Sequence, residues 1–410
     1  MLGQAAVAVL ATLLWVLPLE WAARRWIAGR GDPLDKAGAV LRMDARLGWR
    51  QWEHWRGTFL GLPLRTDALG LRNPEGPAPG PGPRVVVLGP SSTFGWGVRE
   101  EETYSRVLEG LLQGRGVPAS VVNAGEIGYS SWQGLEFYRR HYLGSKPDLI
   151  VIAYGVNDVD RHRFYFSDPR PDSEGLARPR SEWMLGAQNL AARLRMFHVA
   201  RRQGMLLLSR LACPLGSKAP QRPVSGLRVS EAEFQSNFHQ LLSLARQEGT
   251  KAVVITSPFL LPDFPPVAPE ARARARRNHE EGLARYGAGD LPGAAALFKD
   301  ALLLDPAGLD AAYYLSASCR VLRRCAESRE AFETARTLEP ARLSADIRRY
   351  NEALRALARS EGVPLVDAEK LLEGGDKALF VDPIHPTAEG HRRIARALSE
   401  AILGRRLLGG

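Results

Sequence analysis

Cysteine is scarce in this sequence, with three residues in 410, and three thiols cannot all pair with one another. Their spacing to histidine also lacks the pattern of a metal site, so neither a disulfide-stapled module nor a zinc centre is predicted. Although Lys plus Arg exceed Asp plus Glu by 10, no long basic run or RNA-binding signature is present, and no nucleic-acid partner is expected. With 45% hydrophobic and 24% charged residues, the chain is too apolar for wholesale disorder, and its length suits two or three domains.

The amino terminus has few charges. Ala5–Leu19 carries none, and its length lies between that of a signal peptide and that of a spanning helix. Because no basic segment precedes it and no small-residue cleavage site follows, residues 1–27 are predicted to be an uncleaved membrane anchor, with a signal segment as the alternative. By the positive-inside rule, Arg24, Arg25 and Arg30 would keep the body in the cytoplasm.

Residues 28–83 are predicted to form an extension and a linker. Trp49, Trp52 and Trp55 recur every three residues, which favours packing onto the main domain over a belt at a membrane interface. Asn73–Pro83 is dominated by proline and glycine, so it is expected to form neither helix nor strand. The main domain therefore begins at residue 84.

Short β-branched runs alternate with amphipathic segments in the main domain. This alternation predicts an α/β fold with a doubly wound, parallel, five-stranded sheet. The predicted strands are Arg84–Gly89, Ser120–Asn123, Asp148–Ala153, Lys251–Thr256 and Val363–Val366.

A repeat interrupts the alternation between the fourth and fifth strands. An offset of 34 residues aligns Phe with Phe, Ala with Ala, Leu with Leu and Pro with Pro, at 298/332, 301/335, 304/338 and 306/340. This period is typical of tetratricopeptide repeats, so residues 278–340 are predicted to be a TPR-like insertion, with an ordinary helical hairpin as the alternative. Two units are too few to be stable alone, which predicts support from the host domain or from a protein partner. The sheet domain then comprises residues 84–277 and 341–404.

Polar residues and glycine follow several of the strands. Because ligands bind at the carboxyl ends of strands in open α/β sheets, these residues are expected to meet at one edge. They are Ser91, Gly128, Asn157, Asp382 and His385. A hydroxyl, an imidazole, a carboxylate and potential N–H donors at one edge predict acyl-transfer chemistry.

The chemistry assigns each residue a role. Ser91 needs a base to remove its proton, and His385 supplies an imidazole that Asp382 can orient. The N–H of Ser91, the N–H of Gly128 and the amide of Asn157 are the expected oxyanion donors. Ser92 is the alternative nucleophile. His391 is the alternative base, although it lacks the preceding aspartate and is predicted to be structural.

At these positions the sequence resembles the SGNH, or GDSL-type, hydrolase family of serine esterases and acyltransferases. The resemblance rests on four blocks, Leu88–Val98, Asn123–Ser130, Gly155–Asp158 and Asp382–Pro386. It implies a flavodoxin-like sheet, the same triad of Ser91, His385 and Asp382, and the same oxyanion donors, without metal or organic cofactor. One departure is that Pro90 replaces the family's usual aspartate before the nucleophile. The replacement bears on how exactly the loop positions Ser91.

The resemblance implies a serine esterase that hydrolyses O-acyl esters of a carbohydrate or lipid. One alternative is a carbohydrate O-acyltransferase that uses the same site. Another is a catalytically degenerate scaffold that acts through the TPR-like insertion. Membrane-tethered bacterial members have similar leading segments, which implies a body anchored in the cell envelope on the extracytoplasmic side, against the arginine count after the apolar run.

Overall fold

The computed structural model describes most of the chain beyond the amino-terminal segment. The described residues are 17–23, 25, 40–73, 82–159, 170–177, 180–194, 196–197, 199–200, 204, 227–260, 267–306, 308–375 and 378–408.

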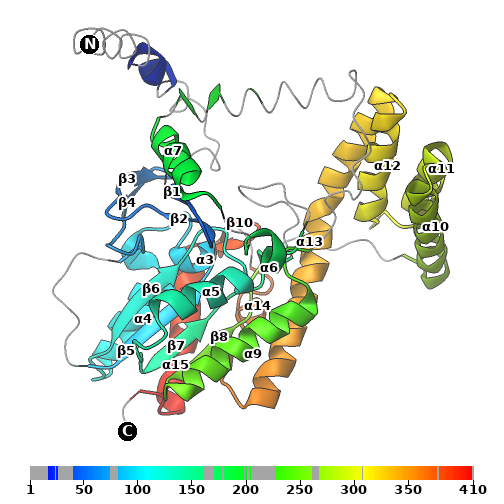
Figure 1. The fold of residues 1–410 in the computed structure, drawn as a ribbon. Coiled ribbons are helices and arrows are strands. Elements are labelled where there is room, and N and C mark those ends of the chain that lie inside the picture. The colour runs from blue at the N-terminus through cyan, green and yellow to red at the C-terminus, as the bar shows by residue number, and fades with distance from the viewer. Residues whose placement is uncertain are drawn as a thin grey trace, which may run out of the picture.

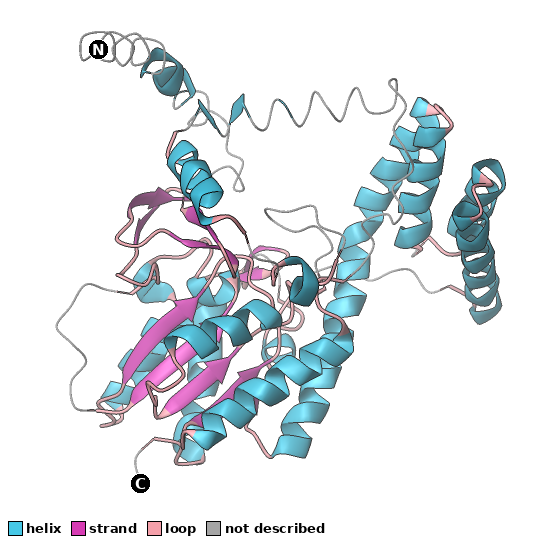
Figure 2. Cartoon of the chain, in the orientation of Figure 1, coloured by secondary structure: helices cyan, strands magenta, loops and turns pink. Residues whose placement is uncertain are grey.

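A parallel five-stranded sheet forms the centre of the main domain (Figure 2). Its strand order is β6-β5-β7-β8-β9, in which the first strand in sequence lies between the second and the third, and the predicted doubly wound sheet is confirmed. The strands are β5 (Arg84–Gly89), β6 (Ser120–Gly125), β7 (Leu149–Ile152), β8 (Lys251–Ile255) and β9 (Leu365–Val366).

Helices cover both faces of this sheet because alternate strand residues point to opposite sides. In β5, Val85 and Val87 pack with α4 (Tyr104–Gly114) and α15 (Ala388–Gly404). Val86 and Leu88 belong to the core on the other face, beneath three helices. These are α5 (Ser131–His141), α9 (Glu231–Gln247) and the carboxyl-terminal half of α13 (Cys325–Glu361).

Residues 40–73 form two small hairpins that pack on the carboxyl edge of the sheet (Figure 1). Their strands are β1 (Leu41–Asp44), β2 (Gly48–Gln51), β3 (Arg56–Phe59) and β4 (Leu62–Arg65). Trp49 is fully buried, and Gln51 donates from Nε2 to the carbonyl of Gly125 at 2.9 Å. The packing predicted for Trp49 is confirmed, since its indole is part of the main core.

A helical insertion separates β8 from β9. Its helices are α10 (Pro269–Gly287), α11 (Leu291–Leu304), α12 (Leu309–Val321) and α13, each packed on the next. The predicted boundary at 340/341 lies inside α13, which is continuous from the insertion onto the sheet. The two repeat units also differ, because Phe298 is fully buried whereas Phe332 is 44% exposed. The structure therefore contains an insertion of helices, and its assignment to the TPR class stays a prediction.

Several short elements complete the described fold. They are α3 (Ser91–Phe94), a 3-10 turn (Glu100–Glu102), α6 (Asp172–Gly175), α7 (Glu182–Ala192), α14 (Ala368–Leu371), β10 (Phe380–Asp382) and β11 (His385–Pro386).

The predicted membrane anchor falls largely outside the described residues, which begin at residue 17. Among the helices that are described, none combines the length and the apolar composition needed to cross a bilayer.

Candidate active site

The turn after β5 presents Ser91. Pro90 precedes α3 in an extended conformation, and Ser91 is the first helical residue. The turn is tight, since a Cβ on Gly89 would lie 1.9 Å from Oγ1 of Thr93. Among the described residues, the backbone N–H of Ser91 has no hydrogen-bond acceptor. Proline in place of the expected aspartate therefore leaves the helical turn intact and the N–H of Ser91 available.

The side chain of Ser91 meets a histidine from the other end of the sequence. Its Oγ lies 2.7 Å from Nε2 of His385, across 294 positions of sequence. Ser91 is 6% exposed and His385 is 7% exposed. His385 begins β11, which pairs with β10 beside the edge of the sheet. The two side chains are within hydrogen-bond distance and largely shielded from water.

Asp382 holds the other side of the imidazole. Its Oδ1 and Oδ2 lie 2.8 and 2.7 Å from Nδ1 of His385. Oδ1 also accepts from the backbone N–H groups of Ile384 and His385, each at 3.0 Å. Burial alone would raise the pKa of Asp382, but these hydrogen bonds and the neighbouring imidazole hold that pKa below its usual value. The carboxylate therefore stays ionised and fixes the ring.

Trp96 packs against the face of the same imidazole. The two rings are nearly parallel, at 14°, with centroids 5.0 Å apart. Phe59 of β3 contacts Trp96 edge to face, with ring centroids 5.0 Å apart. The amino-terminal extension therefore supports the indole that packs on His385. Arg72 of the extension donates to the carbonyls of Gly95 and Val98, at 2.7 and 2.8 Å.

Gly128 lies in the loop after β6, with φ of 77°. This left-handed conformation suits glycine, and an added Cβ would lie 3.3 Å from the indole of Trp49. The carbonyl of Ile127 accepts from Nε1 of Trp49 at 2.7 Å. Because the C=O and N–H of a trans peptide point in opposite directions, this bond turns the N–H of Gly128 away from Trp49. No acceptor for that N–H occurs among the described residues.

Arg228 fixes the next peptide. It donates from Nη1 to the carbonyl of Gly128 at 2.8 Å and lies over the ring of Trp49 at 5.5 Å. Its charge is balanced by Asp172 at 3.0 Å, and both side chains are almost completely buried. The sequence offers little signal for this pair, because Arg228 ends an arginine-rich stretch, residues 161–228, in which no single arginine is distinguished by a motif. The structure instead buries Arg228 beneath the loop of Gly128.

Asn157 follows β7 and is 8% exposed. Its Nδ2 donates to the carbonyl of Tyr129 at 3.0 Å, which joins the second and third loops and leaves one amide hydrogen over. The adjacent Asp158 accepts from the backbone N–H of Ser131 at 2.9 Å, at the start of α5. Burial raises the pKa of Asp158 to about 7, although the hydrogen bonds from Ser131 oppose it. Asp158 thus anchors α5 beside the candidate donors.

The rival residues lie in other environments. His391 is fully buried, and its Nδ1 accepts from the backbone N–H of Tyr104 at 3.1 Å. Burial lowers the pKa of His391 to about 3, and Arg72 and His385 add to the effect. Ser92 has no hydrogen bond to a histidine within the part of the chain that is described. Of the two candidate serines, Ser91 is therefore the one that is bonded to an imidazole in the described structure.

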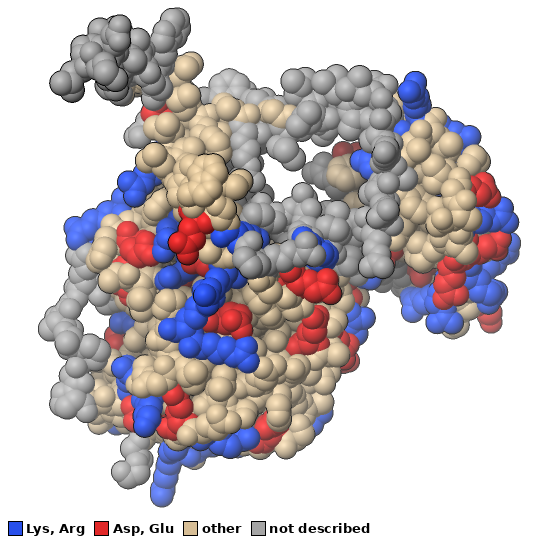
Figure 3. Space-filling view, viewed as in Figure 1, with Lys and Arg blue, Asp and Glu red and all other residues tan. Residues whose placement is uncertain are grey.

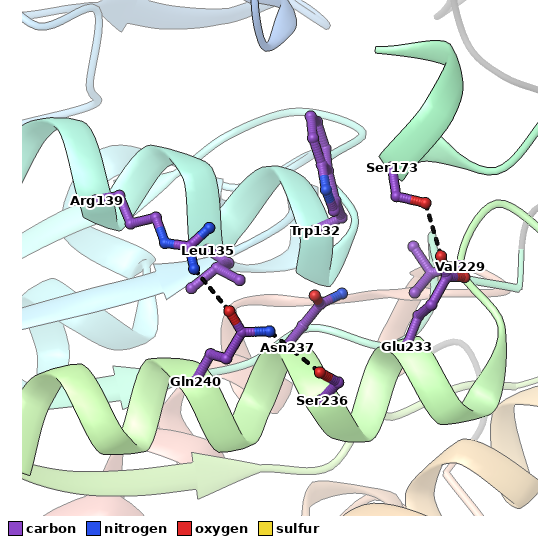
Figure 4. Close-up of a pocket in the computed structure, with 9 residues that line it drawn as sticks. All are labelled: Trp132, Leu135, Arg139, Ser173, Val229, Glu233, Ser236, Asn237 and Gln240. Atoms are coloured by element: carbon purple, nitrogen blue, oxygen red, sulfur yellow. Dashed lines mark hydrogen bonds between the residues drawn. The ribbon is translucent and has the colours of Figure 1, made fainter. Parts of the chain in front are cut away.

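A separate pocket of about 230 Å³ lies between α5 and α9 (Figure 4). Trp132 and Arg139 come from α5, and polar side chains bond across the pocket to α9, from Arg139 to Gln240 and from Ser173 to Glu233. None of the lining residues belongs to the cluster around Ser91. The described residues also contain no group of three or more metal-ligating side chains.

A hydroxyl, imidazole and carboxylate in series at the carboxyl edge of a parallel sheet are typical of serine-dependent hydrolases. The family model of the GDSL-like lipases and acylhydrolases matches residues 87–316 and 316–393. The chain therefore belongs to the GDSL-like lipase/acylhydrolase family, as the sequence blocks predict. No curated protein is detectably similar in sequence.

A search of solved structures finds matches to this chain at low sequence identity. A lipase/acylhydrolase from Enterococcus faecalis is 15% identical, with a TM-score of 0.39, over 80% of this chain and 97% of that one. The acetyl xylan esterase AlAXEase is 13% identical, with a TM-score of 0.38, over 78% and 99%. A variant of an acetyl-xylooligosaccharide esterase from Geobacillus Stearmophilus is 15% identical, with a TM-score of 0.37, over 79% and 95%.

Proposed function

We propose that this protein is a serine esterase that hydrolyses O-acyl esters of a carbohydrate or lipid, with Ser91, His385 and Asp382 as its catalytic triad. The observation that carries the proposal is the 2.7 Å contact between Oγ of Ser91 and Nε2 of His385. Membership of an acylhydrolase family supports the same reaction class.

The proposed reaction begins with proton transfer from Oγ of Ser91 to Nε2 of His385 as the oxygen attacks the ester carbonyl. Asp382 fixes Nδ1 as the protonated nitrogen, so that Nε2 is free to accept. The imidazolium then protonates the leaving alcohol, and an acyl-serine remains. Water attacks this intermediate, with His385 again acting as the base, and the acid is released.

The proposed oxyanion site uses the N–H groups of Ser91 and Gly128 and the remaining amide hydrogen of Asn157. The absence of an acceptor for either backbone N–H within the described residues supports this role. Removal of one such donor typically costs about 3–4 kcal/mol of transition-state stabilisation. Such donors stabilise the oxyanion only if they already point at its position. The hydrogen bonds from Trp49 and Arg228 to the carbonyls of Ile127 and Gly128 support this orientation of the Gly128 N–H.

A fluorophosphonate probe tests this proposal because it reacts with activated serines. We expect wild-type protein to be labelled, Ser91→Ala to be unlabelled, and the matched control Ser92→Ala to label like wild type. The proposal would be contradicted if the probe labelled Ser91→Ala, or if it failed to label folded wild-type protein. Supplying an acceptor sugar with an activated acetyl ester distinguishes the two outcomes of the acyl-serine, since a transferase forms acetyl-sugar faster than acetate.

We also propose that the apolar run before residue 20 anchors the protein in the cell envelope, with the body on the extracytoplasmic side. A fusion of a periplasm-specific reporter to the carboxyl terminus tests the side, and an inactive reporter in a stably expressed fusion would contradict it. For the insertion, we retain the proposal of a protein partner, favoured by the 44% exposure of Phe332. The variant Phe332→Ser should weaken the binding of such a partner without changing the turnover of esters.

A further inference from the structure

Helix α7 turns its apolar side chains outward. Trp183 is 76% exposed, Met184 is 58% exposed and Leu190 is 68% exposed, while Leu185 on the other side is buried. These three residues lie within about two turns of one another on the helix. In water, a surface helix normally buries its apolar side chains and exposes its polar ones. An exposed apolar face of this kind therefore marks a surface that is covered in the working state of a protein.

Residues 17–23, which are helical, show the same inversion. Leu17, Leu19 and Trp21 are 62%, 51% and 66% exposed. Glu20 is only 7% exposed, and its carboxylate accepts from the backbone N–H of Met196 at 3.0 Å. The charged residue thus faces the protein and the apolar residues face outward. The six outward residues, three from each helix, are called the apolar patch below.

The apolar patch is held to the body by hydrogen bonds. Asn189 of α7 accepts from the backbone N–H of Met43 at 2.6 Å and donates to its carbonyl at 3.0 Å. Arg193, next after α7, lies over the ring of Trp52 at 5.0 Å. Figure 1 shows both helices at the same end of the molecule, and Figure 3 shows an uncharged surface over α7. These contacts fix α7 on the body, and residues 17–23 are joined to the segment after α7 through Glu20 and Met196.

We propose that the apolar patch rests in the interfacial layer of a lipid bilayer and so gives the protein a membrane contact beyond its amino-terminal run. The uncharged sequence from Ala5 leads directly into Leu17, so a bilayer that takes up this run holds Leu17 and Trp21 at its surface. Because α7 lies at the same end of the molecule as residues 17–23, we expect its outward residues to meet the same bilayer surface. Two tryptophans suit an interface, because indole has an apolar body and a polar N–H. Arg25, over the ring of Trp21 at 5.8 Å, suits the phosphate layer.

This contact would set the orientation of the body. α7 packs on β1, which pairs with β2, and β2 carries Trp49 to the loop of Gly128. The carboxyl edge of the sheet thus lies on the side of the patch and would face substrates displayed near the membrane surface. That consequence rests on the proposed function, whereas the contact itself does not.

Bromine atoms in lipid acyl chains quench nearby tryptophans, which tests the contact in the full chain. The protein is placed in phosphatidylcholine vesicles with and without brominated chains. The fluorescence of Trp183→Phe is then subtracted from that of wild type to give the signal of Trp183. We expect the fluorescence assigned to Trp183 to fall at least about twofold, because an interfacial indole reaches the upper acyl chain. Trp132→Phe is the control, and its subtraction should give an unquenched signal. A Trp183 signal that is equal in both kinds of vesicle would overturn the proposal.

A double variant separates the bilayer from a second copy of the chain. Met184→Asp with Leu190→Asp should abolish quenching of Trp183 while ester turnover and circular dichroism stay unchanged. Leu303→Asp on α11, where the leucine is 75% exposed, is the matched control and should behave as wild type. If the wild type is a dimer in detergent, the double variant is a monomer, and Trp183 stays unquenched in vesicles, the patch binds another copy and the proposal fails. Because turnover is measured separately, failure of the esterase assignment is distinguishable.

Discussion

The edge of the sheet around Ser91 and the arm formed by α10, α11 and α12 are built in opposite ways. At the edge, ionisable groups are buried and bonded, as in the pair of Arg228 with Asp172. In the arm, helices pack through small residues such as Ala294 and Ala301, and the arginines of α10 are exposed. Burying charge is costly unless each group has a partner. The edge thus holds charged groups in fixed positions, as the proposed reaction requires, whereas the arm is held together by close packing of its helices.

The largest expected effect comes from the carboxylate at this edge. Asp382→Asn should lower kcat for a small ester about 10⁴-fold, because the amide no longer selects the tautomer that leaves Nε2 able to accept. The matched change in the arm, Asp310→Asn, should alter kcat less than about twofold, because Asp310 lies on α12 outside the cluster around Ser91, and its part-exposed ion pair with Arg342, at 3.8 Å, contributes little. Steady-state kinetics on both variants checks the prediction. A similar loss of kcat in Asp382→Asn and Asp310→Asn would contradict the proposed difference between the edge and the arm.

Two buried phenylalanines sharpen the comparison. Phe238 of α9 and Phe298 of α11 are both fully buried, and each Phe→Ala change should cost about 3–5 kcal/mol in the region it belongs to. Phe238→Ala should lower the melting temperature and the turnover together. Phe298→Ala should destabilise the arm, as seen by hydrogen exchange, with turnover nearly unchanged. Equal losses of turnover would show that the arm supports the site.

Glu126 tests the cost of burying charge at the edge. Burial raises its pKa from 4.5 to about 8, although Arg50 opposes the shift. The folded protein therefore keeps a proton that the unfolded chain has released, so the free energy of unfolding falls as pH rises from about 4.5 to about 8. Between about pH 5 and about pH 7.5, wild type should lose about 3 kcal/mol more than Glu126→Gln. Denaturant unfolding at each pH measures this difference.

Glu136→Gln is the control for that experiment, because Glu136 forms a surface ion pair with Arg139. Its pH dependence should follow wild type. Parallel pH profiles of wild type and Glu126→Gln would mean that the buried carboxyl is ionised in the folded protein.

The smallest effect concerns the positioning of Gly128. Trp49→Phe removes the donor to the carbonyl of Ile127 and keeps most of the ring packing. We expect kcat to fall about 10-fold to 100-fold with KM little changed, because a misplacement on the order of 1 Å at a reacting centre costs up to about 100-fold. Trp132→Phe, in the pocket between α5 and α9, should change kcat less than about twofold. A loss confined to KM would contradict a positioning role.

The sequence predicts the candidate site well because its residues follow strands. Each buried β-branched run fixes where a strand ends, and the carboxyl ends of parallel strands share one edge, so Ser91, Gly128 and Asn157 are expected together from pattern alone. His385 follows β9 only after α14 and β10, and the tertiary structure brings it to Ser91. The repeat of 34 residues likewise predicts helices in the insertion. It does not predict that α13 continues across residue 340, since that continuity depends on the packing of Tyr350 and Leu354 on the sheet.

The sequence by itself determined the order of the strands along the chain, the residues at their ends and the existence of a helical insertion, because these depend on local periodicity and on turn chemistry. Only the tertiary structure decided that Arg228 and Asp172 are buried together under Gly128, that Trp49 holds the peptide of that glycine, and that α7 shows its apolar side to the surroundings. Contacts of this kind join positions far apart in sequence. They arise from burial and partner choice, which no local pattern records.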